Sequence, residues 1–387
     1  MMDPCTIDAY FSGKEAILTD AVSRLVRIDS TLGPAGPGKP FGDGPAAALD
    51  EMLVLAQELG LSGENLAGYV GVVDLNSADT VLHILGHLDV VDPGEGWTVT
   101  DPFVPKEVDG LLYGRGTSDD KGPLIAALLA MKAAQDLAAP LRKNVRLILG
   151  TDEETGFRDI HWYYANHSYA PHTLSPDGDF PIINLEKGHY QPTFRAVWAP
   201  ETALPRVTAC TGGPRLNMVP PKAQATVLGL PRQTIEATLA ALSLEPALTV
   251  SLSDRTDGSV HILCTGQGAH ASTPQEGHNA QTALVALLAA LPLADLPSTR
   301  ALHALATLFP HGDHLGRGMG MAQEDPLSGP LTLAFTRLTL TDTGLEGRFD
   351  ARTPLCGTHE SICQTAEAAL AQVGFSVEGT LDPPHYV

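Results

Sequence analysis

Acidic residues and histidine gather in four short, glycine-containing segments of this 387-residue chain. The segments are GHLDV at 86–90, GRGTSDDKG at 114–122, TDEETG at 151–156 and SPDGD at 175–179. Carboxylates that lie within a few ångströms of one another repel unless a cation sits among them. Carboxylate and imidazole ligands without thiolates suit Zn²⁺, Mn²⁺ or Co²⁺. The four segments therefore predict a metal site, provided that the fold brings them together.

The elements around these segments predict that they converge. His87 follows the apolar run Val81–Leu85, which is typical of a buried strand. Glu153 follows a second run of this type, Val145–Leu149, and Asp119 comes just before a predicted helix. Ligands gather outside the carboxyl ends of the strands in an open parallel sheet. We therefore expect these side chains to share one edge of an α/β sheet.

The spacing within two of the segments suggests how the groups divide the work. Residues i and i+2 of an extended chain share a face, so Asp89 can accept the second ring N–H of His87 and orient the ring. Of the adjacent acids Glu153 and Glu154, one can bind a metal while the other acts as a base toward water. Each segment alone also has an ordinary structural explanation, such as helix capping or a turn at Asp177. Their combination in one α/β block favours the shared metal site.

The order of helices and strands predicts two kinds of region. Up to about residue 186, predicted helices such as 10–27 and 121–137 alternate with short apolar strands. This order favours an α/β domain around a buried, mostly parallel sheet. After about Lys187 the chain alternates in hydropathy, as at 223–227 and 331–349, and carries further helices, which favours α+β lobes.

The overall composition excludes several classes of protein. Hydrophobic residues make up 43% and charged residues 18% of the chain, which is typical of a globular protein. The formal net charge of −21 argues against a nucleic-acid partner and against binding to an anionic membrane. The N-terminus has no secretory signal pattern, and no apolar run is long enough to span a bilayer. Five scattered cysteines without a C-x-x-C pair predict a cytoplasmic protein without a disulfide framework.

Several longer motifs resemble those of a known family. GHLDVV, YGRGTSDDKGP, GTDEETGF and SPDGDFP, together with PFGDGPA and GQGAHAS, are similar to motifs of the aminoacylase/carnosinase family of two-metal peptidases. The resemblance is closest to its bacterial dipeptidase V branch, the Xaa-His or β-Ala-Xaa dipeptidases. It implies a di-zinc peptidase-like catalytic domain at 1–186, an inserted two-lobed α+β lid at 187–381 and the start of a return linker at 382–387. The implied reaction is hydrolysis of the amide bond of short peptides through a water that bridges two metals.

The resemblance also implies roles for individual residues of the catalytic domain. The metal ligands would be His87, Asp119, Glu154 and Asp177. Asp119 would bridge two Zn²⁺ ions, for which Mn²⁺ or Co²⁺ are alternatives, and the peptide bond after Asp119 would be cis. His87 and Asp177 would complete one site, and Glu154 would bind the second ion. Glu153 would be the general base that activates the bridging water.

Three residues of the predicted lid match substrate-handling residues of the family. His270, in GQGAHAS, would stabilise the oxyanion of the tetrahedral intermediate. Asn217, in RLNMVP, and Arg352, in FDAR, would hold the terminal carboxylate of a small peptide, a group that a guanidinium can bind through two hydrogen bonds. Without the resemblance, Arg352 also fits an ordinary surface arginine at a strand end. A two-lobed lid implies a monomer.

The chain departs from the family pattern in its last segment, LDPPHYV at 381–387. In the family, further residues follow this segment, among them a histidine that completes the second metal site. We therefore expect weak or absent binding of the second ion and impaired activity of this form. Two alternatives stay open: an inactive or ligand-binding homologue, and an amidase of the same family that acts on N-acyl amino acids.

Overall fold

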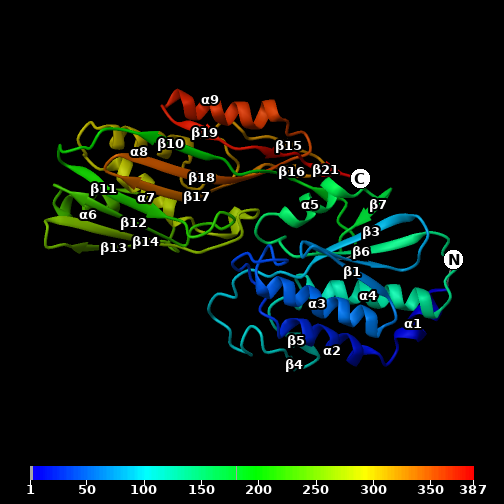
Figure 1. The fold of residues 1–387 in the computed structure, drawn as a ribbon. Coiled ribbons are helices and arrows are strands. Elements are labelled where there is room, and N and C mark those ends of the chain that lie inside the picture. Colours follow the sequence, from blue (N-terminus) through cyan, green and yellow to red (C-terminus); the bar gives the residue numbers. More distant parts are fainter. Residues whose placement is uncertain (1–2, 180) are drawn as a thin grey trace. The chain divides into compact units, whose positions relative to one another are not determined.

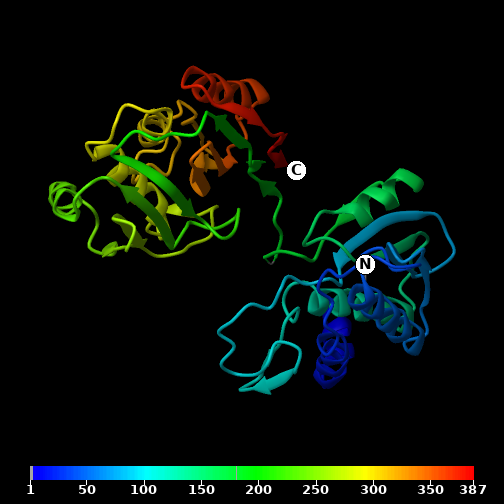
Figure 2. The same cartoon turned by 60° about the vertical axis from the view of Figure 1, so that its left-hand side comes forward.

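The computed structural model describes residues 3–179 and 181–387, so Phe180 of the SPDGDFP segment lies outside the described residues. The chain divides into two compact units, Met1–Pro181 and Ile182–Val387, coloured blue to green and green to red in Figure 1 and Figure 2. Among the described residues, no helix is both long enough and apolar enough to cross a membrane.

The first unit is built on a five-stranded sheet in the order β1-β2-β6-β3-β7. Its strands are β1 (Ser62–Leu66), β2 (Val70–Asp74), β3 (Thr80–His87), β6 (Asn144–Gly150) and β7 (His172–Leu174). β6 and β7 run parallel to β3, whereas β1 and β2 form a tight hairpin, with β2 antiparallel to β6. A short turn can only join antiparallel neighbours, which explains why the sheet is mixed. The predicted α/β class is confirmed, and the sheet is parallel where the predicted site residues lie.

Helices cover both faces of this sheet (Figure 1). The remaining elements of the unit are α1 (Pro4–Phe11), α2 (Glu15–Val26), α3 (Asp43–Glu58), α4 (Lys121–Asp136), α5 (Arg158–Asn166), β4 (Lys106–Val108) and β5 (Leu111–Tyr113). Side chains alternate between the faces along β6. Leu147 and Leu149 pack with α2, α3 and α4, while Ile148 packs with Tyr163 of α5 on the other face. Both cores therefore hold the carboxyl end of β6 in place.

The structure corrects one predicted element. The single helix expected at 10–27 is two helices, α1 and α2, and that prediction was wrong. Gly13 lies between them with φ +76°, a left-handed conformation that ends the first helix and that glycine adopts without strain. The predicted helix at 121–137 and the strands at 81–85 and 145–149 are confirmed as α4, β3 and β6.

The second unit contains a ten-stranded sheet in which every described pairing is antiparallel. Its strands are β9 (Gly188–Tyr190), β10 (Thr193–Val197), β11 (Arg206–Gly212), β12 (Lys222–Leu228), β13 (Thr249–Asp254), β14 (Ser259–Thr265), β17 (Thr332–Thr341), β18 (Gly344–Thr353), β19 (Ser376–Glu378) and β20 (Leu381–Asp382). Two short antiparallel pairs form separate two-stranded sheets: β15 (Glu324–Asp325) with β16 (Gly329–Pro330), and β8 (Leu185–Glu186) with β21 (His385–Tyr386).

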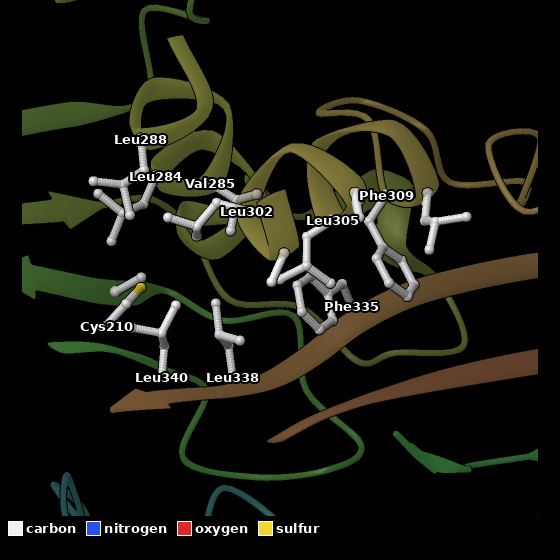
Figure 3. Packing of buried hydrophobic residues seen from close by; sticks show 14 of the residues in the cluster. Cys210, Leu284, Val285, Leu288, Leu302, Leu305, Phe309, Phe335, Leu338 and Leu340 are labelled. Carbon is white, nitrogen blue, oxygen red and sulfur yellow. The ribbon is translucent and has the colours of Figure 1, made fainter. Parts of the chain in front are cut away.

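Helices pack against this sheet to form the core of the second unit. They are α6 (Arg232–Ala241), α7 (Ala280–Ala290), α8 (Pro297–Leu308) and α9 (Thr365–Gln372), with one 3₁₀ turn at Pro274–Glu276 and one π-helical turn at Glu360–Gln364. Figure 3 shows side chains of α7 and α8, such as Leu284 and Leu305, above Cys210, Phe335 and Leu340 of the sheet. Burial alternates along β12, as a strand with one covered face requires.

Candidate active site

The predicted site residues of the first unit meet where its parallel strands end. β3 ends at His87, which is in register with Gly150, the last residue of the adjacent parallel strand β6. The loop that follows Gly150 brings Glu153 next to His87. Asp119 lies just before α4, and Asp177 lies in the segment that follows β7, which is parallel to β3 on its other side. Parallel pairing therefore places residues that are far apart in the sequence at one edge of the sheet.

The imidazole of His87 is the centre of this cluster, and the residue is only 1% exposed. Its Nε2 atom lies 2.9 Å from Oδ1 of Asp119, 3.5 Å from Oδ2 of Asp177 and 3.9 Å from Oε2 of Glu153. Its Nδ1 atom lies 2.9 Å from the backbone oxygen of Asp89. A proton on Nδ1 can be donated to that oxygen, which leaves the lone pair of Nε2 for a metal among the carboxylates.

Two overlapping groups of side chains could hold metal ions. One group is His87, Asp119 and Asp177, and the other is His87, Glu153 and Glu154; within each, one donor atom per residue lies within 4.8 Å of the others. Nitrogen and carboxylate donors suit zinc and similar divalent ions. The structure thus brings together all four residues predicted as ligands, and it places the predicted base Glu153 among them.

The pKa shifts in the cluster follow from burial and from the closeness of several carboxylates to one histidine. Burial and the charges of Glu154 and Asp177 raise the pKa of Glu153 to about 7, although His87 opposes this shift. Burial and the charge of Asp119 raise the pKa of Glu154. Burial disfavours the imidazolium of His87, but its hydrogen bonds to Asp119 and Asp177 outweigh burial and raise its pKa. A single imidazolium therefore faces several carboxylates, and a divalent cation would neutralise the excess negative charge.

Asp89 lies beside the ring of His87, and it also has a second contact that was not predicted. It is only 3% exposed, and its carboxylate Oδ1 lies 3.5 Å from Nδ1 of His87, farther than its backbone oxygen. The two carboxylate oxygens accept the backbone N–H groups of Glu153 and Glu154, each at 3.1 Å. Asp89 therefore contacts the histidine mainly through its backbone, while its side chain fixes the loop that carries both acids.

Asp120 is a fully buried residue of the site to which the sequence analysis gave no role. Its Oδ2 accepts the backbone N–H of His87 at 3.2 Å, and burial raises the pKa of its carboxyl to about 7. A Cβ atom at Gly86 would collide with the same oxygen, so a glycine there makes room for the carboxylate. The peptide bond between Asp119 and Asp120 is cis, as the resemblance implied. The glycine before His87 and the second acid of SDD are the signals that point to this contact.

In the second unit, the three predicted substrate-handling residues lie at one end of the sheet. His270 is exposed, and its Nδ1 lies 2.6 Å from Oγ of Ser272. An isolated β-bridge pairs His270 with the residue that follows Asn217. The hydroxyl of Thr332 donates to the backbone oxygen of Ser272 at 3.1 Å, and Thr332 is in register with Arg352 across β17 and β18. These contacts connect the three residues within the second unit.

Arg352 has a structural partner that the sequence did not suggest. Its Nε and Nη2 atoms donate to the two carboxylate oxygens of Asp350, at 2.9 and 3.1 Å. Asp350 is fully buried, and it also accepts a hydrogen bond from Gln191 and lies 3.4 Å from Nε2 of His189. Burial favours the neutral acid, but the neighbouring His189 and the hydrogen bonds from Arg352 and Gln191 outweigh it and lower the pKa of Asp350. Arg352 therefore compensates a buried charge.

A buried histidine among carboxylates at the ends of parallel strands is typical of metal-dependent hydrolases. Among solved structures, human carnosine dipeptidase 1 is similar over 99% of this chain and 81% of that chain, with 17% identity and a TM-score of 0.46. A Bacillus subtilis (strain 168) protein named "Putative dipeptidase YtjP" is 34% identical over 361 residues, which are 92% of this chain and 77% of that protein. The Beta-Ala-Xaa dipeptidase of Lactobacillus delbrueckii subsp. lactis is 36% identical over 323 residues, or 82% and 67% of the two chains. The model of Peptidase family M20/M25/M40 matches residues 83–384, and the chain belongs to this metal-dependent family.

Proposed function

We propose that the chain is a metal-dependent dipeptidase that hydrolyses the amide bond of short peptides. The observation that carries the proposal is the convergence of three separate carboxylate-bearing segments on Nε2 of His87. Two relatives that cover most of this chain are named as dipeptidases, one of them for β-Ala-Xaa peptides, which supports this substrate class.

The donor set favours Zn²⁺, with Mn²⁺ and Co²⁺ as alternatives. His87 and Asp177 would hold one ion, Glu154 would hold a second ion, and Asp119 would contact both. The contacts within the group His87, Asp119 and Asp177 support the first assignment. When bound, such ions polarise the scissile carbonyl and lower the pKa of a water molecule.

Glu153 is the proposed general base. Its side chain is 29% exposed, so it can reach a water molecule in the cluster while most of it stays shielded from solvent. A base works best when its pKa lies near the working pH, and burial raises the pKa of Glu153 to about 7. Glu153 would take a proton from the attacking water and then give that proton to the leaving amine. Its backbone N–H is fixed by Asp89, which keeps the base in place.

Substrate handling is assigned to three residues of the second unit. His270 would stabilise the developing oxyanion, and its exposed ring supports this role. Asn217 and Arg352 would hold the terminal carboxylate of the peptide. Asp350 occupies two donor atoms of Arg352 and fixes the plane of the guanidinium, so the remaining Nη1 atom would contact substrate.

The proposed setting is a monomeric, cytoplasmic enzyme whose partner is a small peptide and not a nucleic acid or a membrane. All five cysteines of the described chain are free, which suits a reducing compartment. The acidic net charge of −21 disfavours nucleic acid and anionic lipid as partners.

The experiment that tests the function compares substrate classes on metal-depleted and reloaded protein. The protein is treated with a chelator, reloaded with Zn²⁺, Mn²⁺ or Co²⁺, and assayed on Xaa-His and β-Ala-Xaa dipeptides and on N-acyl amino acids. Metal-dependent cleavage of dipeptides that is lost in Glu153→Gln supports the proposal. Cleavage of N-acyl amino acids alone would make the chain an amidase, and turnover no higher than that of Glu153→Gln would make it a ligand-binding homologue.

A further inference from the structure

The loop that carries Glu153 and Glu154 is held by a continuous row of hydrogen bonds to carboxylates. Four consecutive backbone N–H groups, those of residues 151–154, each donate to a carboxylate oxygen. The first two donate to Oδ2 of Asp159 at 2.6 and 3.0 Å, and the next two donate to Asp89 at 3.1 Å each. Two buried acids thus determine where this stretch of backbone lies.

The position of Asp159 lets its carboxylate accept hydrogen bonds from the backbone of this loop. It is fully buried in the first turn of α5, and its other oxygen, Oδ1, accepts the N–H of Ile160 at 2.7 Å. Glycine at position 150 leaves space for it, because a Cβ atom there would lie only 2.8 Å from Oδ2 of Asp159. The last residue of β6 and the first turn of α5 are therefore shaped around one carboxylate.

The helix that carries Asp159 is itself firmly attached to the sheet. Tyr163 of α5 is fully buried against Ile148 of β6, and its hydroxyl accepts a hydrogen bond from Nη1 of Arg146 at 3.2 Å. At the start of the helix, Arg158 donates from its backbone N–H and its guanidinium to the carboxylate of Asp152. The loop is thus connected to a helix whose position is fixed by the sheet. Arg158 contacts the side chain of Asp152, and Asp159 accepts the backbone N–H groups of residues 151 and 152.

We infer that Asp159 is a positioning residue for the metal-binding cluster: it holds the backbone of residues 151–152 so that the side chains of Glu153 and Glu154 stay beside His87. The inference deepens the proposed function, and its catalytic consequence rests on that function. Residues that orient metal ligands from behind typically change activity or metal affinity by roughly 10- to 100-fold when they are removed. A displaced base also loses rate because reacting groups must be aligned closely.

The test compares Asp159→Ala, Asp159→Asn and a control, Tyr163→Phe. Tyr163→Phe removes the hydrogen bond from Arg146 and weakens the attachment of α5, but it leaves every contact of the loop intact. In metal-free protein, Asp159→Ala should accelerate amide hydrogen exchange at residues 150–157, whereas Tyr163→Phe should not. Well below the unfolding temperature, Asp159→Ala should lower kcat roughly 10- to 100-fold with little change in KM. Asp159→Asn keeps an acceptor oxygen and should recover part of the loss.

A Co²⁺ titration followed by absorption spectroscopy separates this inference from the proposed function. If the wild type cleaves no dipeptide, the proposed function fails, but weaker Co²⁺ binding and faster exchange in Asp159→Ala still support positioning. If Asp159→Ala and Tyr163→Phe unfold at similarly lowered temperatures while exchange at 150–157, Co²⁺ affinity and kcat all stay at wild-type values, Asp159 only stabilises the fold and the inference is overturned.

Discussion

Carboxylates are compensated in opposite ways in the cluster around His87 of the first unit and at Asp350 of the second unit. In the first unit, burial raises the pKa values of Glu153 and Asp120 to about 7, and the charge of the nearby Asp177 adds to both shifts. In the second unit, Asp350 is fully buried and has its pKa lowered, because His189 and Arg352 lie against it. Asp350 is compensated by a cationic side chain of the protein, whereas the cluster around His87 leaves a place for a cation from solution. Burial of a single acid therefore does not mark a functional site, whereas a cluster of carboxylates without enough counter-charge does.

The largest expected effect concerns the base of the first unit. Glu153→Gln keeps the size of the side chain and the backbone contact to Asp89 but removes proton transfer. We expect turnover of dipeptides to fall by a factor of roughly 10² to 10⁴, the usual contribution of general acid–base catalysis. Steady-state kinetics on protein of verified metal content measures this loss. Turnover close to that of the wild type would show that another group accepts the proton.

The next largest effect concerns the buried ion pair of Arg352 and Asp350 in the second unit. Arg352→Met keeps most of the apolar stem but leaves Asp350 buried without its cation. Breaking a buried ion pair from one side typically costs 3–5 kcal/mol, and because His189 and Gln191 still contact Asp350, we expect about 3 kcal/mol. Urea unfolding measures the change. If Arg352 only bound substrate, KM would rise and the free energy of unfolding would stay constant.

The control for this prediction is the double variant Arg352→Met, Asp350→Asn, which removes both charges and should regain part of the stability. The pH dependence gives a second check. The pKa of Asp350 is lower in the folded than in the unfolded chain, so its stabilising contribution is present above the unfolded pKa and is lost as the pH falls through the folded pKa. In Arg352→Met the folded pKa rises toward the unfolded value, so the stability that the protein loses on acidification should be smaller than in the wild type. Identical acid limbs for wild type and variant would contradict the pairing.

A smaller effect distinguishes the units by their response to metal. Zn²⁺ at about 100 times its dissociation constant should stabilise the protein by about 2.7 kcal/mol, because it binds only the folded chain. His87→Ala should abolish this gain, whereas Arg352→Met should leave it intact. Because metal replaces the proton on His87, the gain should shrink as the pH is lowered. Thermal unfolding with Zn²⁺ or chelator measures both effects, and an undiminished gain in His87→Ala would place the metal elsewhere.

The two sites also differ in how far the sequence could predict them. In the first unit the chemistry lies in short motifs at the ends of apolar strands, so His87, Asp119 and Glu153 could be expected at one sheet edge. The side chain of Asp89 was predicted to contact the histidine, and its Oδ1 lies 3.5 Å from Nδ1 of His87, but the sequence did not predict that the same carboxylate accepts two backbone N–H groups of the acid loop. Backbone donors carry no residue-specific signal, so a sequence cannot indicate which carboxylate they contact.

Side-chain pairs that depend on packing could not be predicted from the sequence either. The contact of Arg352 with Asp350 lies within one strand, two residues apart, a spacing that does not distinguish a surface arginine from one that compensates a buried acid. The single helix predicted at 10–27 failed for a related reason, because one glycine within an amphipathic pattern can either be tolerated or end a helix. In each case the outcome depends on what packs against the segment.

The smallest predicted effect concerns a third way to bury an acid, which uses neither a metal nor a cationic side chain. Glu201 of the second unit is 8% exposed, and its two carboxylate oxygens accept the backbone N–H and the hydroxyl of Ser298 at the start of α8, at 2.9 and 2.5 Å. The positive end of the helix dipole and a free backbone N–H compensate the charge. Glu201→Ala should therefore cost about 1 kcal/mol, the usual loss for a helix cap.

Urea unfolding of Glu201→Ala beside Glu201→Gln separates the two contributions. Gln keeps one acceptor oxygen for the helix and loses only the charge, so its destabilisation should be smaller than that of Ala. The gain in stability on adding Zn²⁺ should be the same in both variants as in the wild type, because Glu201 is not one of the proposed metal ligands. A loss of about 3 kcal/mol in Glu201→Ala, as large as that expected for Arg352→Met, would contradict the assignment of Glu201 as an ordinary helix cap.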